Sequence, residues 1–563
     1  MAGSKITTTA TSKTNNKWMT TVASIWIQCT SGSLYTFPIY SSALKSSQGY
    51  DQSTLDTVTV FKDFGANAGI LSGVLYSSVA PSTADVNGGG GRGRPWVVLA
   101  AGAVQCFAGY LLMWLAVVGV LHRPPVPVVC LFMLLAAHGM SFFNTANVVT
   151  AVRNFPNYSG TAVGIMKGFL GLSGAILIQV YQTIFQNRPT SFLLMLALLP
   201  TFNSLLLMYF VRIFGTKDVD EKKHLDGFSA IALIVAAYLM AVIILEDSFT
   251  LPLSAHIFIL AVLMILIASP ICVAIKARHG DSLRFSRTAL IEENQLSDDS
   301  DQLDAGTYVR RDPRGYDQVP DIADHETGIS DTTVGWVENL NLLQAMRTGN
   351  FWFLFLAMAC GMGTGLATLN NMSQIGGSLG YTNFETSTLV SLWSIWNFLG
   401  RFGAGYVSDY FLNVKGWPRP SFMAITLAIM SVGHSVIASG LPGTLYAGSV
   451  LVGVCYGSQW SLMPTIASEI FGVAHFGTIF NTITIACPVG SYIFSVRVIG
   501  YIYDKEASGK SNTCTGIHCF MLSFLVMASA SFLGFCLALA LFFRTRTFYK
   551  QVLFRRLRHS VRE

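Results

Sequence analysis

Long apolar stretches, separated by short polar turns, run through most of the chain. A helix that crosses a bilayer needs about 20 largely apolar residues. By that criterion we expect spans near residues 18–42, 56–79, 95–120, 126–154, 160–185, 191–214, 225–245, 254–275, 350–374, 385–409, 420–440, 443–470, 475–503 and 517–543. The pattern predicts an all-α polytopic membrane protein with about fourteen spans.

The spans are related, because short motifs recur in the two halves of the chain. The sequence RNF at 153–155, followed by Gly160, matches EIF at 469–471, followed by Gly477. Parallel repeats of this kind are typical of transporters built from two similar halves. We therefore expect six helices, an insert of two, and six more.

Polar stretches divide the chain into six segments. We expect a cytosolic N-terminal segment (1–17), a six-helix bundle (18–214), a two-helix insert (215–275), a cytosolic acidic linker (276–349), a second six-helix bundle (350–543) and a basic cytosolic tail (544–563). The linker has too few apolar residues to bury a core, so we expect it to be largely disordered.

Composition and charge support the membrane interpretation and predict an orientation. The chain is 52% hydrophobic and only 12% charged, whereas soluble proteins are about one quarter charged. Basic residues gather in alternate loops and in the tail, so the positive-inside bias predicts that both termini are cytosolic. The N-terminal segment lacks the apolar core of a secretory signal. We expect an integral multi-pass protein of the plasma membrane or an endomembrane, in contact with lipid and not with nucleic acid.

The sequence gives no sign of an enzyme. It contains no Ser/His/Asp set and no metal-ligand cluster, and the glycine-rich GGGGRGRP at 88–95 lacks the Lys-Ser/Thr ending of a phosphate-binding loop. We therefore expect no catalytic residues, no cofactor and no metal site. For the oligomeric state, a monomer is favoured.

One basic residue interrupts the tenth span, where a charge is costly unless a partner or a function offsets it. Arg401 lies eight residues before Asp409, at the expected cytosolic end, or about 12 Å into the membrane at 1.5 Å per residue. Trp393 and Asn397 precede it at four-residue intervals, so an aromatic ring, an amide and a guanidinium share one helical stripe. A guanidinium binds a carboxylate in a bidentate fork, which makes the stripe a candidate anion site. The alternative is a salt bridge that only joins two helices.

The loop after this span, within NFLGRFGAGYVSDYFLNVKGWPRP, resembles the signature loop of the major facilitator superfamily. The matching residues are Gly405, Asp409, Gly416 and Arg419. A weaker echo follows the second span, with Ser77 in the place of the aspartate. The resemblance implies the facilitator fold of two six-helix bundles.

Lys167 lies at a depth similar to that of Arg401, among glycines that allow close helix approach. In facilitator folds the fifth helix faces the second helix of the other half, so Lys167 and Arg401 are expected at one interface. Two cations there, without an obvious buried acid, predict an anionic ligand. The alternative is that Lys167 extends to the cytosolic surface.

Other polar residues on the predicted spans are candidates for a substrate cavity. They are Gln28, Tyr35, Asn144, Asn147, Asn370, Asn371, Gln374, Gln459 and Trp460. Each of them alone is more often part of an interhelical hydrogen bond.

Charged residues at the expected cytosolic ends are candidates for a gate. They are Arg153, Asp409, Lys415, Arg419 and Glu469. We expect Glu469 to pair with the Lys415–Arg419 turn when the cytosolic side is closed.

Cys514 and Cys519 lie in or beside a polar loop on the expected extracytosolic side, where disulfides persist. One expectation is a disulfide between them. A free pair is the other, because so short a gap is geometrically demanding.

Several longer stretches resemble the plant nodulin-like, nuclear fusion defective 4-like branch of the facilitators. They are WIQCTSGSLYTFPIYSSALK, VRNFPNYSGTAVGIMKGFLGLSGAI, LNNMSQIGGSLGY and GRFGAGYVSDYF. That branch is similar to oxalate/formate exchangers and monocarboxylate transporters. In the latter an arginine on the matching helix recognises the carboxylate, which implies the same role for Arg401. Asn397 stands where they carry an acid, so proton coupling stays open.

The resemblance implies a secondary active or facilitative transporter that works by alternating access on a small organic anion such as a carboxylate. The alternative is a transport-inactive membrane receptor or organelle-remodelling factor with the same fold. Ser77 and Asn397, which replace acids, favour that alternative.

Overall fold

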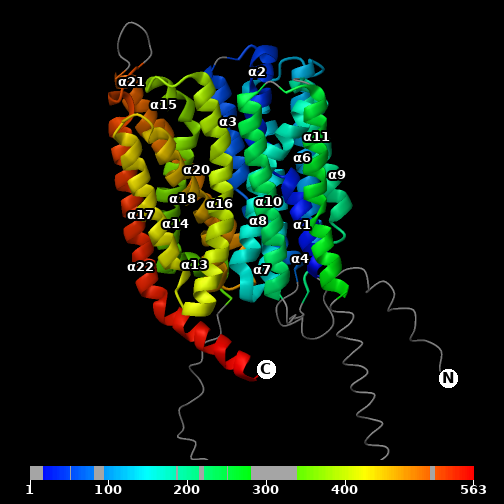
Figure 1. Ribbon diagram of the computed structural model, residues 1–563, viewed down its shortest axis with the longest axis vertical. Coiled ribbons are helices and arrows are strands. Elements are labelled where there is room, and N and C mark those ends of the chain that lie inside the picture. The colour runs from blue at the N-terminus through cyan, green and yellow to red at the C-terminus, as the bar shows by residue number, and fades with distance from the viewer. Residues whose placement is uncertain are drawn as a thin grey trace, which may run out of the picture.

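The computed structural model describes residues 17–50, 52–80, 94–185, 188–214, 221–249, 251–279, 339–506 and 514–562. Within these residues every regular element is a helix. Two bundles of roughly parallel helices stand side by side, one from the first half of the chain and one from the second (Figure 1). The predicted all-α architecture of two bundles with an insert is confirmed.

The first bundle holds the first six spans, two of which are interrupted. The first span consists of α1 (Lys17–Thr30), a 3-10 turn η1 (Ser33–Thr36) and α2 (Phe37–Gln48), and the second of α3 (Gln52–Asn67) and α4 (Ile70–Val79). The others are α6 (Pro95–Val118), α7 (Val126–Asn154), α8 (Ser159–Val180) with a π-helical extension η3 (Tyr181–Phe185), and α9 (Pro189–Leu207). A short 3-10 turn, η2 (Pro156–Tyr158), joins α7 to α8.

The second bundle repeats this plan. It contains α14 (Gly349–Asn370) with α15 (Met372–Ser378), then α16 (Asn383–Lys415), α17 (Arg419–Ala438) and α18 (Thr444–Phe471). Its fifth span is divided into α19 (Phe476–Thr484), α20 (Ala486–Ser491), a π-helix η5 (Tyr492–Gly500) and α21 (Tyr501–Glu506), and its sixth is α22 (His518–Arg562). We call the face at which α1 begins and from which α22 projects the inner face, and the opposite face the outer face.

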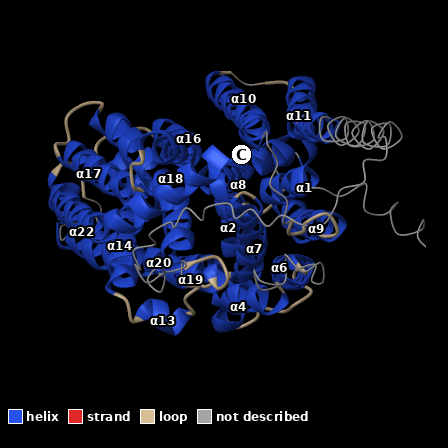
Figure 2. Ribbon diagram, turned by 90° about the horizontal axis from the view of Figure 1, so that it is seen from below, coloured by secondary structure: helices blue, strands red, loops and turns tan. Residues whose placement is uncertain are grey.

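The insert consists of α10 (Glu221–Ser248) and α11 (Leu253–Ala268), and it lies on one flank of the molecule (Figure 2). Lys17 Nζ lies 2.6 Å from Glu221 Oε1 in a buried ion pair, and the indole of Trp26 donates to the carbonyl of Ile267. Helix α10 also contacts both α8 and α16, where the two bundles meet. The insert is therefore attached to the first bundle while it touches the second.

Ten helices in the described residues are long and apolar enough to cross a membrane. The remaining four predicted spans, which are the first, second, tenth and twelfth, are interrupted or more polar. Three of them contact the opposite bundle directly, since α16 and α18 pack on α8, and α4 packs on α19. On α16, Arg401 and Asp409 both contact α8 across this interface, and such polar residues lower the hydropathy of the span.

Several expected spans differ from the structure. The first span breaks at residues 31–36, and the ninth breaks at Asn371. The last span does not end at residue 543, because α22 continues unbroken to Arg562 and includes the expected tail. Periodicity alone does not place such breaks and extensions, since each depends on a packing partner.

The end of the expected linker is folded. Residues Leu342–Met346 form α13, whose N-terminus is closed by a capping box between Asn341 and Gln344. The Leu340 amide donates to the carbonyl of Phe471, 3.0 Å away, which ties this segment to the end of α18. Residues 280–338, and the N-terminal segment 1–16, lie outside the described residues.

Cys514 and Cys519 form a disulfide with a Cα–Cα separation of 5.9 Å, within the usual range. We expect both cysteines to resist alkylation in detergent-denatured protein until a reductant is added, as measured by mass spectrometry. The eight free cysteines, such as Cys272 and Cys536, are the internal control and should be alkylated without reductant. Full alkylation of Cys514 and Cys519 before reduction would contradict the bridge.

Candidate substrate site and gate

Two buried cations from different bundles lie against one aromatic ring. The Lys167 side chain of α8 and the Arg401 side chain of α16 are each only 1% exposed. Lys167 Nζ lies 4.8 Å from the centre of the Trp460 ring, and Arg401 Cζ lies 5.3 Å from it. Phe480 adds a second ring, 4.9 Å from Lys167 Nζ. Trp460 on α18 therefore joins the two cations that the sequence singled out.

The guanidinium of Arg401 is held in place by three oxygen atoms. Its Nε donates to Asn397 Oδ1 at 2.8 Å, one helical turn earlier. Its Nη1 donates to the backbone carbonyl of Lys167 at 3.2 Å, and its Nη2 donates to the hydroxyl of Tyr35 at 3.1 Å. Tyr35 reaches this position because the first span breaks at η1. We call Tyr35, Lys167, Asn397, Arg401, Trp460 and Phe480 the cation site.

Neither cation has a carboxylate partner in the part of the chain that the structure describes. Burying a charge costs several kcal/mol unless it is paired, and a cation over an aromatic ring recovers only about 0.5–2 kcal/mol. Two like charges beside Trp460 also repel each other. An anion placed between them would reduce both the cost of burying the charges and the repulsion between them. The chemistry of the site therefore suits a small anionic group.

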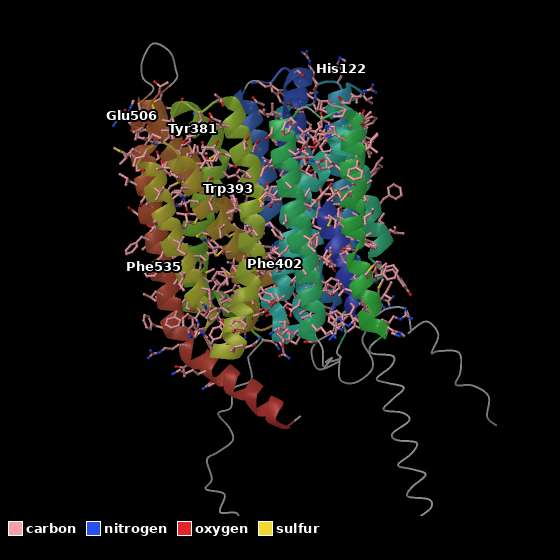
Figure 3. All side chains as sticks on the ribbon, in the orientation of Figure 1. His122, Tyr381, Trp393, Phe402, Glu506 and Phe535 are labelled. Carbon is pink, nitrogen blue, oxygen red and sulfur yellow. A yellow bond between two sulfur atoms is a disulfide. The ribbon has the colours of Figure 1, made fainter. Side chains whose placement is uncertain are left out.

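A row of aromatic rings continues outward from the cation site along α16 and α18. The Trp393 and Tyr456 ring centres are 6.2 Å apart, and those of Tyr456 and Trp460 are 6.3 Å apart. Trp393 lies on the outer side of Phe402 along α16 (Figure 3). The indole N–H groups of Trp393 and Trp460 have no hydrogen-bond partner among the described residues. The row therefore offers apolar surface with two unused donors.

Three of the amides predicted to line the cavity have unused hydrogen-bonding groups. Both amide atoms of Gln28 on α1 and of Asn147 on α7 are buried without a partner among the described residues, as is Oδ1 of Asn144. Buried polar groups are nearly always hydrogen-bonded. These amides are therefore positions where water or a ligand is expected.

The other predicted amides lie elsewhere. Gln459 donates to the Met430 sulfur, so its amide faces the interior of the second bundle rather than the cations. Asn370 and Asn371 line a separate cavity of about 570 Å³ between α3 and η5, together with Asp63 and other residues. Gln374 is exposed and is not among the residues that line it. The structure therefore does not gather Asn370, Asn371 and Gln374 at the cation site.

A charged network closes the inner end of the α8–α16 interface. The fully buried Arg419 guanidinium forms ion pairs with Asp409 and with Glu469 Oε1, the latter at 2.8 Å. The Asp409 carboxylate also accepts the backbone N–H groups of Gly160 and Thr161, at the N-terminus of α8. That end of a helix is electropositive, which favours a carboxylate there. Asp409 therefore joins the second bundle to the first.

Close backbone contact accompanies this network. A Cβ atom on Gly405 would lie 2.3 Å from the Gly160 carbonyl oxygen, so only glycine permits this approach. The interface between α4 and α19 contains a similar close approach, because a Cβ on Gly73 would lie 2.4 Å from the carbonyl oxygen of Gly477. Gly160 and Gly477 are the glycines that the sequence repeat paired. The two bundles are thus in backbone contact at both interfaces near the inner face.

Of the two remaining predicted gate residues, Arg153 contacts the other bundle and Lys415 does not join the network. Arg153 Nη2 donates to the carbonyls of Val473 and Ala474 in the other bundle, at 3.1 and 3.0 Å. Lys415 does not take part in the network, since its ammonium lies over the Phe411 ring. Sequence reasoning missed Tyr549, whose hydroxyl donates to Glu469 Oε2 at 2.8 Å. Nothing in the sequence signals this contact, which depends on the path of α22.

Replacing Glu469 with glutamine should shift the protein toward an inner-open state. The amide keeps a hydrogen bond to Arg419 but loses the charge, which we expect to cost about 1–2 kcal/mol, or roughly 5- to 30-fold in the closed-to-open ratio. Hydrogen–deuterium exchange of the first turn of α8 should therefore become faster. Glu506→Gln, at an exposed residue near the outer face (Figure 3), is the matched control. Equal exchange in the two variants would show that the pair does not hold the gate.

Comparisons with known proteins agree with this architecture. The solved structure of a proton:xylose symporter of the major facilitator superfamily, XylE, superimposes with a TM-score of 0.51 at 12% identity, and the match covers 95% of each chain. The chain therefore has the fold of the major facilitator superfamily.

The family assignment is more specific. Residues 17–275 match the family described as Nodulin-like, and residues 333–551 match the NFD4 C-terminal domain. Protein NUCLEAR FUSION DEFECTIVE 4 of Arabidopsis thaliana is 27% identical over 560 residues, which cover 95% of this chain and 90% of that protein. The chain belongs to the nodulin-like branch of the major facilitator superfamily.

A further relative is named as a transporter. Probable transporter MCH1 of Yarrowia lipolytica is 28% identical over 170 residues, which cover 28% of this chain and 34% of that protein. This chain therefore matches only about a third of that relative.

Proposed function

We propose that this protein is a secondary transporter that carries a small organic anion, such as a carboxylate, by alternating access. The observation that carries the proposal is the cation site, where Lys167 and Arg401 from different bundles lie against Trp460 without a carboxylate partner in the described residues. An anion that touches both cations bridges the two bundles. Binding energy is then coupled to the relative position of the bundles, as alternating access requires.

The contacts near the two faces support a cycle of this kind. Near the inner face, glycine backbones and the Arg419 network hold the bundles together. The 570 Å³ cavity between α3 and η5 lies farther toward the outer face, and residues of both bundles line it. This arrangement corresponds to a state closed at the inner face. Transport requires the Gly160–Gly405 and Gly73–Gly477 contacts to separate in another state.

Asn397 has a defined role in this proposal. Its Oδ1 accepts from Arg401 Nε, so it fixes the direction of the guanidinium without neutralising it. A carboxylate at this position would pair with Arg401 and compete with a bound anion. The amide therefore leaves the full positive charge available for the substrate.

Flux into proteoliposomes tests the proposal. We expect uptake of one or more labelled mono- or dicarboxylates, and no uptake of neutral or cationic solutes of similar size. Competition by unlabelled carboxylates would identify the preferred chain length. Transport restricted to neutral or cationic solutes would contradict the anion assignment, and absence of flux for every solute would favour the transport-inactive receptor.

A further inference from the structure

The last helix is far longer than a membrane crossing requires. Helix α22 contains 45 residues, or roughly 67 Å at 1.5 Å per residue, whereas the hydrocarbon core is about 30 Å thick. The continuous apolar run of α22 ends at Phe543, and the rest of the helix projects from the inner face. Figure 1 shows this part turning beneath the second bundle toward the middle of the molecule. We call residues 544–562 the tail helix.

The tail helix has one sign of charge. It carries seven basic residues and no acidic one, namely Arg544, Arg546, Lys550, Arg555, Arg556, Arg558 and Arg562. Leu553, Leu557 and Val561 recur at every fourth position, and such positions lie along one line of a helix. A basic helix with an apolar line is typical of segments that lie in the interface of an anionic membrane.

The start of the tail helix is fixed to the second bundle. Tyr549 is only 1% exposed, and its hydroxyl donates to Glu469. Arg544 Nε donates to Asn350 Oδ1 at 3.0 Å. These contacts direct the tail helix across the inner face instead of away from it, and in Figure 2 the C-terminus lies below the region of α8 and α16. The tail helix therefore lies where the headgroups of the adjacent leaflet would be.

We propose that the tail helix binds the anionic lipid headgroups of the leaflet at the inner face, and that this binding stabilises the closed inner gate. Anionic lipid attracts each Lys or Arg near its surface. The tail helix is joined through Tyr549 to Glu469, which also binds Arg419. Anionic lipid that holds the tail helix in place therefore maintains the position of the Glu469 carboxylate that Arg419 requires. The proposal does not depend on which solute is transported.

Hydrogen–deuterium exchange of the full-length protein in nanodiscs tests lipid binding. In discs of phosphatidylcholine with phosphatidylserine, amides of residues 552–562 should exchange at least about tenfold more slowly than in phosphatidylcholine alone. The triple variant Arg555→Gln/Arg556→Gln/Arg558→Gln should lose this difference. Lys276→Gln/Arg278→Gln, which removes two cations from the residues that follow the insert, should keep it.

Two outcomes would overturn the proposal. One is equal exchange of the tail helix in the two lipid compositions. The other is that soluble inositol hexakisphosphate, added to phosphatidylcholine discs, slows exchange of the tail helix as much as phosphatidylserine does. The ligand would then be a free polyanion and not a lipid surface.

Tyr549→Phe separates lipid binding from the effect on the gate. We expect this variant to retain slow exchange of the tail helix in anionic discs but to lose the lipid-dependent protection of the first turn of α8. If that protection stays lipid-dependent in Tyr549→Phe, the coupling through Glu469 is wrong. If wild-type α8 shows no lipid dependence, the proposed effect on the gate is wrong.

Discussion

Replacing Arg401 with alanine should lower the affinity for the transported anion by roughly 10- to 150-fold, which corresponds to the loss of about 1.5–3 kcal/mol from one charge-assisted contact. Arg401→Lys should fail almost as severely, because an ammonium is a point charge that cannot make the planar bidentate fork with a carboxylate. The measurement is the concentration dependence of uptake into proteoliposomes. Arg212→Ala is the matched control, since Arg212 also lies over an aromatic ring, that of Tyr209, but outside the cation site.

Replacing Lys167 should raise the stability of the empty protein and abolish its stabilisation by the anion. These opposite effects distinguish a functional role of Lys167 from a structural one. Lys167→Met removes one of two neighbouring buried cations, so the melting temperature of the empty protein should rise. The transported anion should raise the melting temperature of the wild-type protein but not that of Lys167→Met. If Lys167 only stabilises the fold, the melting temperature should fall instead. Normal transport by folded Arg401→Ala would show that Arg401 is structural.

The fold was accessible from the sequence because its signals are local. Runs of apolar residues define the spans, and the repeat that pairs Gly160 with Gly477 defines the two halves. The buried cations were equally visible, since a charge within an apolar span stands out whatever its surroundings. Their shared ring was not predicted, because the contact of Lys167 and Arg401 with Trp460 depends on how three helices pack.

What the sequence did not reveal depends on breaks and long-range contacts. Tyr35 reaches Arg401 only because the first span breaks at η1. Tyr549 reaches Glu469 only because α22 continues past the membrane. The adjacent amides Asn370 and Asn371 lie at the end of α14, where the ninth span breaks, and they line the cavity beside η5 instead of the cation site. Hydropathy does not contain this information.

Replacing Gly405 with alanine should prevent the inner face from closing fully. The new Cβ would lie 2.3 Å from the Gly160 carbonyl oxygen and 3.0 Å from the Gly164 Cα, and both are backbone atoms that move only if a helix moves. Overpacking of this kind costs about 1–3 kcal/mol, or roughly 5- to 150-fold in the closed-to-open ratio. Transport should fall by a similar factor once closure limits the cycle.

Gly403→Ala is the control for this variant, because a Cβ at Gly403, on the same helix, meets no atom within 4 Å. Hydrogen–deuterium exchange should be faster at the first turn of α8 in Gly405→Ala than in Gly403→Ala, since the Gly160 and Thr161 amides would lose Asp409. Equal exchange and equal transport in the two variants would rule out this contact as part of the gate. None of the residues of the cation site is replaced in Gly405→Ala, so the variant should still bind the anion from the inner side. Retained binding with lost transport would separate the gate from the substrate site.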